Sequence, residues 1–358
     1  MRELEKLLDR IIQRININLR ELDYDITPFI KNLVPLNQMV KFYAFYGITP
    51  NHPLDLVFRH SSLAGTYFLG KIRTRNSILY KSDIRGDELK QQGDVFNYQK
   101  FEIPITRDEG IDIEDSFLIK TLVHNFSHDP ETLEKFFIRD TVSAQGANVH
   151  GSPSDGCFLG PLATVDLTTM RDCVIGTYSY VQAGEIGHLN VRPGTIWVRS
   201  PGDFNFLYQH PLDKLDHYIN FHASRPPQGL FIDFVEDREE AFQRVFDVVN
   251  LEKPVSVPPN TSLDRYAVIK PKTHISENVL VSQRAYLQNA WLGKGANAQE
   301  RCYIINSRLE GFDVTAHGAT IIEADLGKQI FVGFNSFLRG RVDSRLKIGD
   351  ESIVMPHT

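Results

Sequence analysis

The sequence has little of what marks proteins that bind nucleic acid, span a membrane or depend on disulfides. Its 358 residues carry 39 Lys and Arg against 45 Asp and Glu, a formal net charge of −6, which gives no basic footprint for nucleic acid. No apolar run approaches the roughly 18 to 20 residues that a membrane-spanning helix needs, and the first ten residues are too charged for a signal peptide. The three cysteines, Cys157, Cys173 and Cys302, form no CxxC motif, so we expect reduced thiols in a cytoplasmic protein.

What is present is a six-residue period through residues 275–358. Each hexad begins with an aliphatic residue and has a small or β-branched residue four places later, as in ISENVL from Ile275, VSQRAY from Val281 and LGKGAN from Leu292. A period of six is too long for a helix face and matches the hexapeptide β-helix, in which each hexad is one short strand and a turn. About three hexads, or roughly eighteen residues, close one coil, and several coils must stack to bury their aliphatic residues. Further hexads begin at Ala298, Leu326, Val332 and Ile348.

Glycines and an upstream set of repeats extend this pattern. A glycine after the hexad head allows a tight corner where a Cβ would crowd the backbone, and the glycines in this position are Gly293, Gly327, Gly333 and Gly349. A first block of hexads begins at Leu159, Val165 and Ile175. The sequence therefore predicts a mainly β protein with a parallel β-helix in two blocks.

The segments around the repeats divide the chain into four parts. We expect a helical and mixed α/β domain over residues 1–140, a first β-helix block over 141–199, an insertion with one helix over 200–259 and a second β-helix block over 260–358.

Four helices are expected outside the repeats. An amphipathic stripe over residues 1–20 predicts a helix that packs on its own domain or, as the less favoured alternative, on a partner subunit. Further helices are predicted over residues 27–45, after the Thr27-Pro28 start signal, and over 129–137 and 236–250. The triplet at residues 85–87, Arg-Gly-Asp, is interpreted as a polar surface turn.

The second block carries a family resemblance. The runs LGKGANAQERCYII from Leu292 and VTAHGATIIEADLGKQIFVGFNSFLRG from Val314 resemble the left-handed β-helix proteins of the hexapeptide-repeat superfamily, and within it the γ-class carbonic anhydrases. Residues 295–300, GANAQE, are similar to a Gly-Thr-Asn-Ile-Gln-Asp-like segment of that class, and residues 317–319, HGA, match its His-Gly-Ala segment. The resemblance implies a left-handed coil.

The resemblance also provides a test for zinc. Carbonic anhydrase chemistry needs three neutral imidazoles on the metal and an open position for water. The ligand positions of the family fall on Ile305, His317 and Ile322, and Arg284 and Ala285 stand where an Arg-Gly-Asp segment would be. Because isoleucine cannot bind zinc, we expect no metal and no hydration of carbon dioxide at this site.

Other members of the superfamily transfer an acyl group from a coenzyme A thioester to an amine or hydroxyl, commonly with one histidine as general base between subunits of a trimer. By this resemblance we expect His317 to be the base, Glu323 to orient its imidazole and Asn335 to bind the acceptor. The N–H groups of corner glycines would hold the thioester and its oxyanion, and the candidates are Gly318, Gly327 and Gly333. The resemblance implies coenzyme A thioester as co-substrate, no metal, a small-molecule acceptor and a homotrimer.

Two other functions of the superfamily were weighed, and one of them remains open. The first is a non-catalytic trimeric scaffold or small-molecule binding protein, in which His317 only fills a corner of the coil. A nucleotidyltransferase with a β-helix tail is disfavoured because residues 1–50 contain a single glycine, Gly47, and so lack a glycine-rich nucleotide loop.

Histidines outside the repeats give weaker signals. His124 and His128 are interpreted as unrelated loop residues, and His150 and His188 as structural residues near coil corners. His210, His217 and His222 form a cluster with Asp213 and Asp216, where solvated or core histidines are favoured over metal ligands. Closeness of these residues in space is not visible in the sequence.

Overall fold

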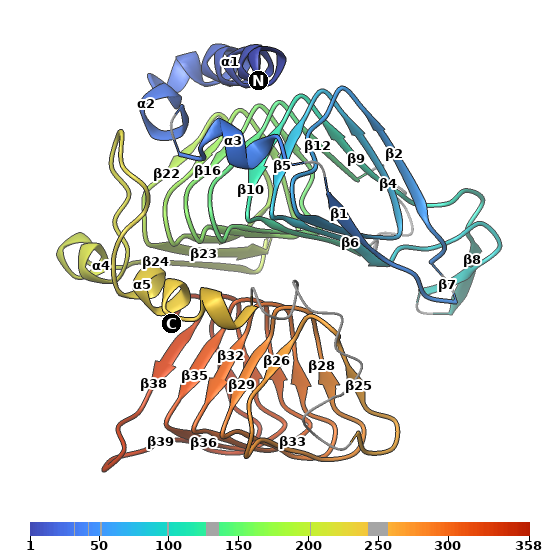
Figure 1. Cartoon of the computed structure of the whole chain (residues 1–358), viewed down its shortest axis with the longest axis vertical. Coiled ribbons are helices and arrows are strands. Elements are labelled where there is room, and N and C mark those ends of the chain that lie inside the picture. The colour runs from blue at the N-terminus through green and yellow to red at the C-terminus, as the bar shows by residue number, and fades with distance from the viewer. Residues whose placement is uncertain are drawn as a thin grey trace. The chain divides into compact units, whose positions relative to one another are not determined.

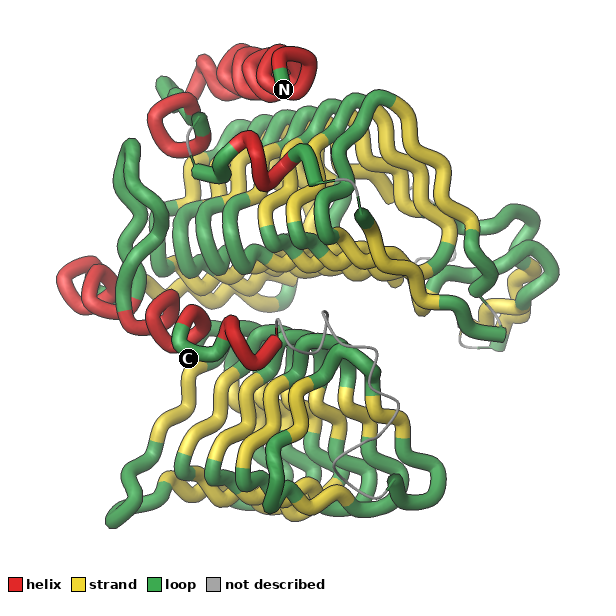
Figure 2. The backbone as a smooth tube through the Cα atoms, viewed as in Figure 1, coloured by secondary structure: helices red, strands yellow, loops and turns green. Residues whose placement is uncertain are grey.

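The chain forms two stacks of short parallel strands (Figures 1 and 2). The computed structural model describes residues 1–31, 33–41, 43–50, 52–98, 100–126, 136–200, 202–242 and 257–358. It divides into two compact units, Met1–Leu230 and Phe231–Thr358, and each unit contains three sheets that wind into a β-helix. The prediction of a mainly β fold with a β-helix in two blocks is confirmed.

Three sheets build the β-helix of the first unit. Sheet A consists, in order, of β1 (Ala44–Gly47), β3 (Thr66–Leu69), β6 (Asp83–Glu88), β11 (Leu122–Phe126), β14 (Asn148–His150), β17 (Thr164–Asp166), β20 (Tyr180–Gln182), β23 (Thr195–Ser200) and β24 (Phe204–Gln209). Sheet B consists of β2 (Asp55–Arg59), β4 (Lys71–Arg75), β9 (Ile111–Glu114), β12 (Phe136–Arg139), β15 (Ser154–Asp155), β18 (Thr168–Arg171) and β21 (Gly184–Gly187). Sheet C consists of β22 (Asn190–Val191), β19 (Val174–Ile175), β16 (Phe158–Leu159), β13 (Val142–Ser143), β10 (Phe117–Ile119) and β5 (Ile78–Tyr80). A hairpin of β7 (Val95–Tyr98) and β8 (Phe101–Pro104) leaves the coil between β6 and β9.

This β-helix begins far upstream of the expected position. Apart from β7 and β8, the described strands between residues 44 and 139, a range assigned from sequence to a mixed α/β domain, belong to the same three sheets as those after residue 141. The Arg-Gly-Asp triplet is accordingly not a turn: it lies in β6, which pairs with β3 and β11. The hexads were not recognised in this region because the β7–β8 hairpin interrupts the coil.

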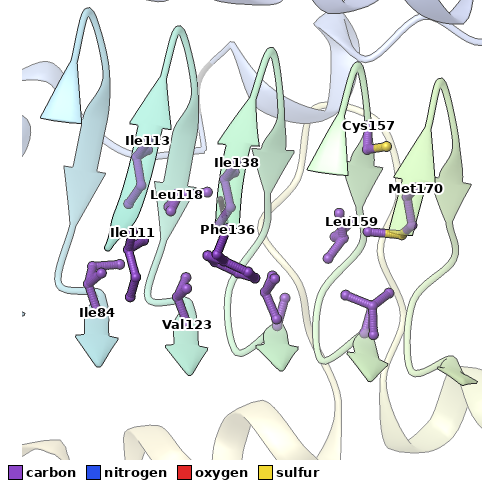
Figure 3. Packing of buried hydrophobic residues seen from close by; sticks show 14 of the residues in the cluster. Ile84, Ile111, Ile113, Leu118, Val123, Phe136, Ile138, Cys157, Leu159 and Met170 are labelled. Carbon is purple, nitrogen blue, oxygen red and sulfur yellow. The ribbon is translucent and has the colours of Figure 1, made fainter. Parts of the chain in front are cut away.

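The coil of the first unit is shorter than the roughly eighteen residues expected. Asn148 and Thr164 are partners on neighbouring strands of sheet A, which gives a 16-residue coil. Tyr180 and Ile196 continue the row at the same interval. The interior of the coil is filled mainly by aliphatic side chains, with Phe136, Cys157 and Met170 among them, as Figure 3 shows.

The amino-terminal helices cover the outer face of sheet C. In α1 (Arg2–Asn18) the residues Leu8, Ile11, Ile12 and Ile15 are buried. They pack on a row of outward-facing residues that are mutual partners in sheet C: Ile78, Phe117, Val142, Phe158 and Val174. The favoured interpretation, that this stripe packs on its own domain, is confirmed.

The single helix predicted over residues 27–45 is wrong. The structure has two short helices there, α2 (Thr27–Ile30) and α3 (Leu36–Met39), and the strand β1 follows. Pro35 separates the helices, because proline has no N–H and disfavours the helical conformation of the residue before it. A 3₁₀ turn, Leu19–Leu22, joins α1 to this region.

The segment between the two β-helices contains a hairpin and helices. Strand β24 pairs antiparallel with β23, and α4 (Leu212–Tyr218) and α5 (Leu230–Glu236) follow. The helix predicted over residues 236–250 is broken by a turn at residues 237–238 and resumes over 239–242, and its remainder lies outside the described residues. Of the helix predicted over 129–137, only the end is described, and there Phe136 and Phe137 belong to β12. No described helix is long and apolar enough to cross a membrane.

The second unit has shorter strands and a 17-residue coil. Sheet D consists of β25 (Ser262–Leu263), β28 (Leu280–Val281), β31 (Asn297–Ala298), β34 (Val314–Thr315), β37 (Phe331–Val332) and β40 (Ile353–Val354). Sheet E consists of β26 (Val268–Ile269), β29 (Tyr286–Gln288), β32 (Tyr303–Ile305), β35 (Thr320–Ile322) and β38 (Phe337–Arg339). Sheet F consists of β27 (His274–Ile275), β30 (Trp291–Leu292), β33 (Arg308–Gly311), β36 (Ala324–Lys328) and β39 (Leu346–Ile348).

A short corner between sheets E and F explains the 17-residue coil. It is turned by one residue with a left-handed backbone, which is Asn289 (φ 46°), Asn306 (φ 48°) or Glu323 (φ 49°) in successive coils. Asn289 Nδ2 donates to Asn306 Oδ1 at 3.1 Å, and Asn306 Nδ2 donates to Glu323 Oε1 at 2.7 Å. Asparagine adopts this backbone conformation more readily than most residues. The corner is therefore a ladder of stacked, hydrogen-bonded side chains.

Candidate functional site

The corner between sheets D and E of the second unit brings together the residues of the candidate site. Gln283, Glu300, His317 and Phe334 follow one another at intervals of one coil. The coils are joined there by backbone hydrogen bonds from Gly318 N to Glu300 O (3.0 Å) and from Asn335 N to His317 O (3.1 Å). The repeat therefore places the His317 side chain between those of Glu300 and Phe334.

His317 and Glu300 form a buried imidazole–carboxylate pair. His317 Nδ1 lies 2.8 Å from Glu300 Oε2, and the two side chains are 4% and 5% exposed. On the other side the imidazole stacks on the Phe334 ring, with centroids 5.6 Å apart and planes at 25°. A carboxylate at this distance stabilises the imidazolium that forms when the ring accepts a proton. The pair can therefore serve as a general base.

Glu323, the residue expected to orient His317, makes other contacts. It continues the corner ladder between sheets E and F through Asn306, and its Oε2 accepts a hydrogen bond from Arg345 Nη1 at 2.8 Å. The residue beside His317 is instead Glu300, which had been noted only as part of the GANAQE segment. The coil length would have identified this partner from sequence. Glu300 stands one 17-residue coil before His317, whereas Glu323 is not one coil away from it.

Asn335 and the three corner glycines have structural contacts. A Cβ on Gly318 would lie 2.1 Å from Asn335 Oδ1, so the Asn335 side chain occupies the space over that glycine. Gly318 N donates to Glu300 O at 3.0 Å and Gly333 N donates to Val354 O at 3.0 Å. These two amides are engaged between coils and so do not form the expected oxyanion site. Gly327 faces Asp350 in the next coil, where a Cβ would lie 2.1 Å from Asp350 Oδ1.

The positions of the other two γ-class zinc ligands belong to an apolar surface. Ile305 and Ile322 are direct partners in sheet E. They share a cluster with Tyr303 of the same sheet and with Phe234 of α5. Neither isoleucine can bind a metal, so the residues present at the positions of the γ-class zinc site do not fit zinc.

A second group of polar residues lies on sheet A of the first unit and was missed from sequence. His124, His150 and Asp166 are successive partners on β11, β14 and β17. The His124 and His150 rings have centroids 5.1 Å apart, and one nitrogen of each lies within 4.8 Å of a nitrogen of the other. His150 Nδ1 lies 2.7 Å from Asp166 Oδ1, and the Tyr180 hydroxyl donates to Asp166 Oδ2 at 2.8 Å.

This arrangement is a chain of side chains that fix one another. Burial, and then the Asp166 charge, raises the pKa of Tyr180, so its hydroxyl remains a neutral donor to Asp166. Asp166 in turn holds Nδ1 of His150 and directs its Nε2 away from the carboxylate. Two imidazoles, one of them backed by a carboxylate, are a common donor set for a divalent transition metal. His150 is thus not the isolated structural residue that we expected, and His124 lies on a strand rather than in a loop.

The other histidines considered from sequence do not come together as a group among the described residues. His188 is an exposed corner residue whose Nδ1 lies 3.7 Å from Glu21 Oε2 and 3.9 Å from Asp172 Oδ2. His210 packs against the ring of Tyr208, and His217, in α4, against that of Tyr218. These contacts differ, and the described residues of that segment do not form a shared metal site. His128 lies outside the described residues.

The cysteines agree with the expectation of reduced thiols. All three are free and buried. Burial raises the pKa of the Cys157 and Cys302 thiols, so neither is a ready nucleophile. A mechanism that depends on a cysteine nucleophile is not supported at these two positions.

Comparisons with known proteins agree with the coil architecture. The family model described as a hexapeptide repeat including loop matches residues 101–223. A crystal structure of a protein from Desulfovibrio desulfuricans G20, provisionally named an acetyltransferase, is similar with a TM-score of 0.91 and 52% sequence identity, and the match covers 99% of this chain and 75% of that one. No curated protein matches the chain significantly. The chain belongs to the hexapeptide-repeat family of left-handed β-helix proteins.

Proposed function

We propose that the chain is an acyltransferase that moves an acyl group from a coenzyme A thioester to an amine or hydroxyl. The observation that carries the proposal is the pair of His317 and Glu300, whose Nδ1 and Oε2 atoms are 2.8 Å apart at a corner of the second unit. The provisional name of the similar protein from Desulfovibrio desulfuricans G20 supports the same reaction class.

In the proposed reaction His317 transfers the proton and Glu300 stabilises the charge that forms on His317. His317 Nε2 takes the proton from the acceptor amine or hydroxyl as that group attacks the thioester carbonyl. Glu300 stabilises the resulting imidazolium. The C–S bond then breaks, and the departing thiolate receives the proton from His317. The products are the acylated acceptor and free coenzyme A.

The proposal is tested by incubating the full chain with acetyl-coenzyme A and a panel of amine and hydroxyl acceptors. We expect acceptor-dependent release of free thiol and an acetylated product detected by mass spectrometry. Thermal unfolding with and without coenzyme A gives an independent readout, because a ligand that binds only the folded state raises the unfolding temperature. If neither turnover nor a rise in unfolding temperature is observed, the proposal is contradicted and the non-catalytic scaffold is favoured. We further propose a cytoplasmic homotrimer, which sedimentation velocity tests.

A second candidate function is metal binding in the first unit. We propose that His124 and His150 supply two ligands to a divalent transition metal, because their ring nitrogens lie within 4.8 Å of each other and Asp166 orients His150. When bound, the metal would supply Lewis-acid chemistry. This proposal replaces our expectation of a protein without metal.

Metal analysis of protein purified without chelator or affinity tag tests this second candidate. We expect near-stoichiometric zinc, or another divalent metal, in the wild type and its loss in His150→Ala. Asp166→Asn should weaken metal affinity by about 10-fold to 100-fold, the usual effect of removing a carboxylate that orients a ligating histidine. His188→Ala is the matched control and should retain the metal. Wild-type protein without metal, even after dialysis against zinc, would rule the site out.

A further inference from the structure

A pocket in the second unit is formed where the coil departs from its regular length. In sheet F, Leu326 pairs with Leu309 across a regular 17-residue coil and with Ile348 across a longer, 22-residue coil. The extra length forms a turn after β38, closed by hydrogen bonds between the backbones of Arg341 and Ser344 at 3.0 and 3.1 Å. The pocket beside this turn has a volume of about 610 Å³ and is lined by Ile322, Glu323, Arg339, Gly340, Arg341 and Val342.

The carboxylates near the pocket are already paired with Arg345. Its Nη1 donates to Glu323 Oε2 at 2.8 Å, and its Nε and Nη2 donate to the two oxygens of Asp325 at 2.9 and 2.8 Å. The hydrogen bonds from Arg345 lower the pKa of Asp325, which therefore stays ionised near neutral pH. The charges of Glu323 and Asp325 are thus largely committed to Arg345.

Arg339 and Arg341 are differently placed. Both are exposed and line the pocket, and within the described residues neither has a carboxylate at ion-pair distance. A planar guanidinium binds phosphate through two parallel hydrogen bonds, and two such groups in one pocket give a strong local preference for a phosphate ester or diphosphate. Ile322 and Val342 give the same pocket an apolar part.

We propose that this pocket binds a phosphate-bearing small molecule, with Arg339 and Arg341 as its phosphate ligands. The apolar residues Ile322 and Val342 contact the organic part of the ligand. Two sources share this chemistry: the phosphates of a coenzyme A thioester, or a free phosphorylated molecule. The proposal does not depend on His317 or on acyl transfer.

Isothermal titration calorimetry on the full chain tests the pocket with three probes: inorganic pyrophosphate, coenzyme A, and dephospho-coenzyme A, which lacks the 3′-phosphate. We expect Arg339→Gln and Arg341→Gln each to weaken binding of pyrophosphate about tenfold or more, the usual range for a lost hydrogen bond to a charged group. Lys294→Gln is the matched control, because it removes an exposed cation of the same unit that is paired with Glu277 at 2.6 Å. It should leave binding unchanged, and circular dichroism checks that all variants are folded.

The outcomes separate the sources and the proposals. Equal weakening for coenzyme A and pyrophosphate in the arginine variants assigns the pocket to the coenzyme, and retained affinity for dephospho-coenzyme A then points to its diphosphate. Weakening for pyrophosphate alone assigns it to another phosphorylated molecule. If the wild type binds none of the probes, or if both arginine variants bind as the wild type does, the inference is overturned. His317→Gln should bind pyrophosphate normally, so loss of turnover and loss of phosphate binding are distinguishable.

Discussion

Replacing His317 by glutamine is expected to lower the rate of acyl transfer by about 10² to 10⁴, the usual contribution of a general base. Glutamine keeps a polar side chain of similar length beside Glu300 but cannot take a proton from the acceptor. The loss should appear in kcat rather than in KM for the thioester, because proton transfer is needed in the transition state and not for binding. Thiol release at saturating acetyl-coenzyme A measures it.

The pH profile distinguishes a base from a packing residue. In the wild type, the rate should fall at acidic pH, since a protonated His317 cannot accept a proton. That acidic limb should be missing in His317→Gln. Glu300→Gln should retain the fall in rate at acidic pH, but with a lower maximum rate. The base remains, but it loses the carboxylate that stabilises its imidazolium. His188→Gln is the control. Wild-type turnover in a folded His317→Gln variant would assign the residue to packing.

Replacing Gly293 by alanine is expected to destabilise the second unit by about 3 kcal/mol, near the upper end of the usual cost of overpacking. Its added Cβ would lie 2.1 Å from Glu310 O and 2.8 Å from Leu309 O in the next coil. Those atoms belong to the backbone of the ladder, so relief requires two coils to separate. Thermal unfolding followed by circular dichroism measures the loss.

Gly349 is a matched control within the same repeat position. It also follows a hexad head, yet nothing lies within 4 Å of a Cβ built on it, because no described coil stacks beyond it at that corner. Gly349→Ala should therefore leave stability unchanged, or raise it slightly because alanine lowers the conformational entropy of the unfolded chain. Equal unfolding temperatures for the two alanine variants would contradict the close-approach explanation of these glycines.

The repeat was readable from sequence because the coil interior requires aliphatic residues at fixed places. The pattern seemed to lapse after Ala298, yet the coil continues there through Ile304, Leu309, Thr315 and Ile321, all fully buried. At each corner between sheets E and F the spacing between interior residues is five positions, not six. The hexad pattern is therefore displaced by one position in every coil. A search for strict hexads cannot follow that shift. Once the 17-residue coil length is known, the interior positions can be read from the sequence again.

The candidate site was only half readable. His317 was found through the His-Gly-Ala segment, but its carboxylate partner was assigned to Glu323 by nearness in sequence, whereas stacking brings Glu300 beside it. The pair of His124 and His150 was missed because their strands, although neighbours in sheet A, are separated in sequence by more than the regular 16-residue coil. Contacts between coils depend on coil length, which sequence periodicity gives only where no excursion intervenes.

Two of the departures from regular coil length bear on how such a chain can diversify. The β7–β8 hairpin adds residues between β6 and β11, and the turn after β38 adds residues before β39. The strands on either side still pair, with one shift of register between β6 and β11 after His124. Because each coil contacts only its neighbours, an added loop leaves the interior unchanged. Ligand choice can then evolve at a corner while folding is conserved in the interior, so relatives should differ most in the lengths of their turns.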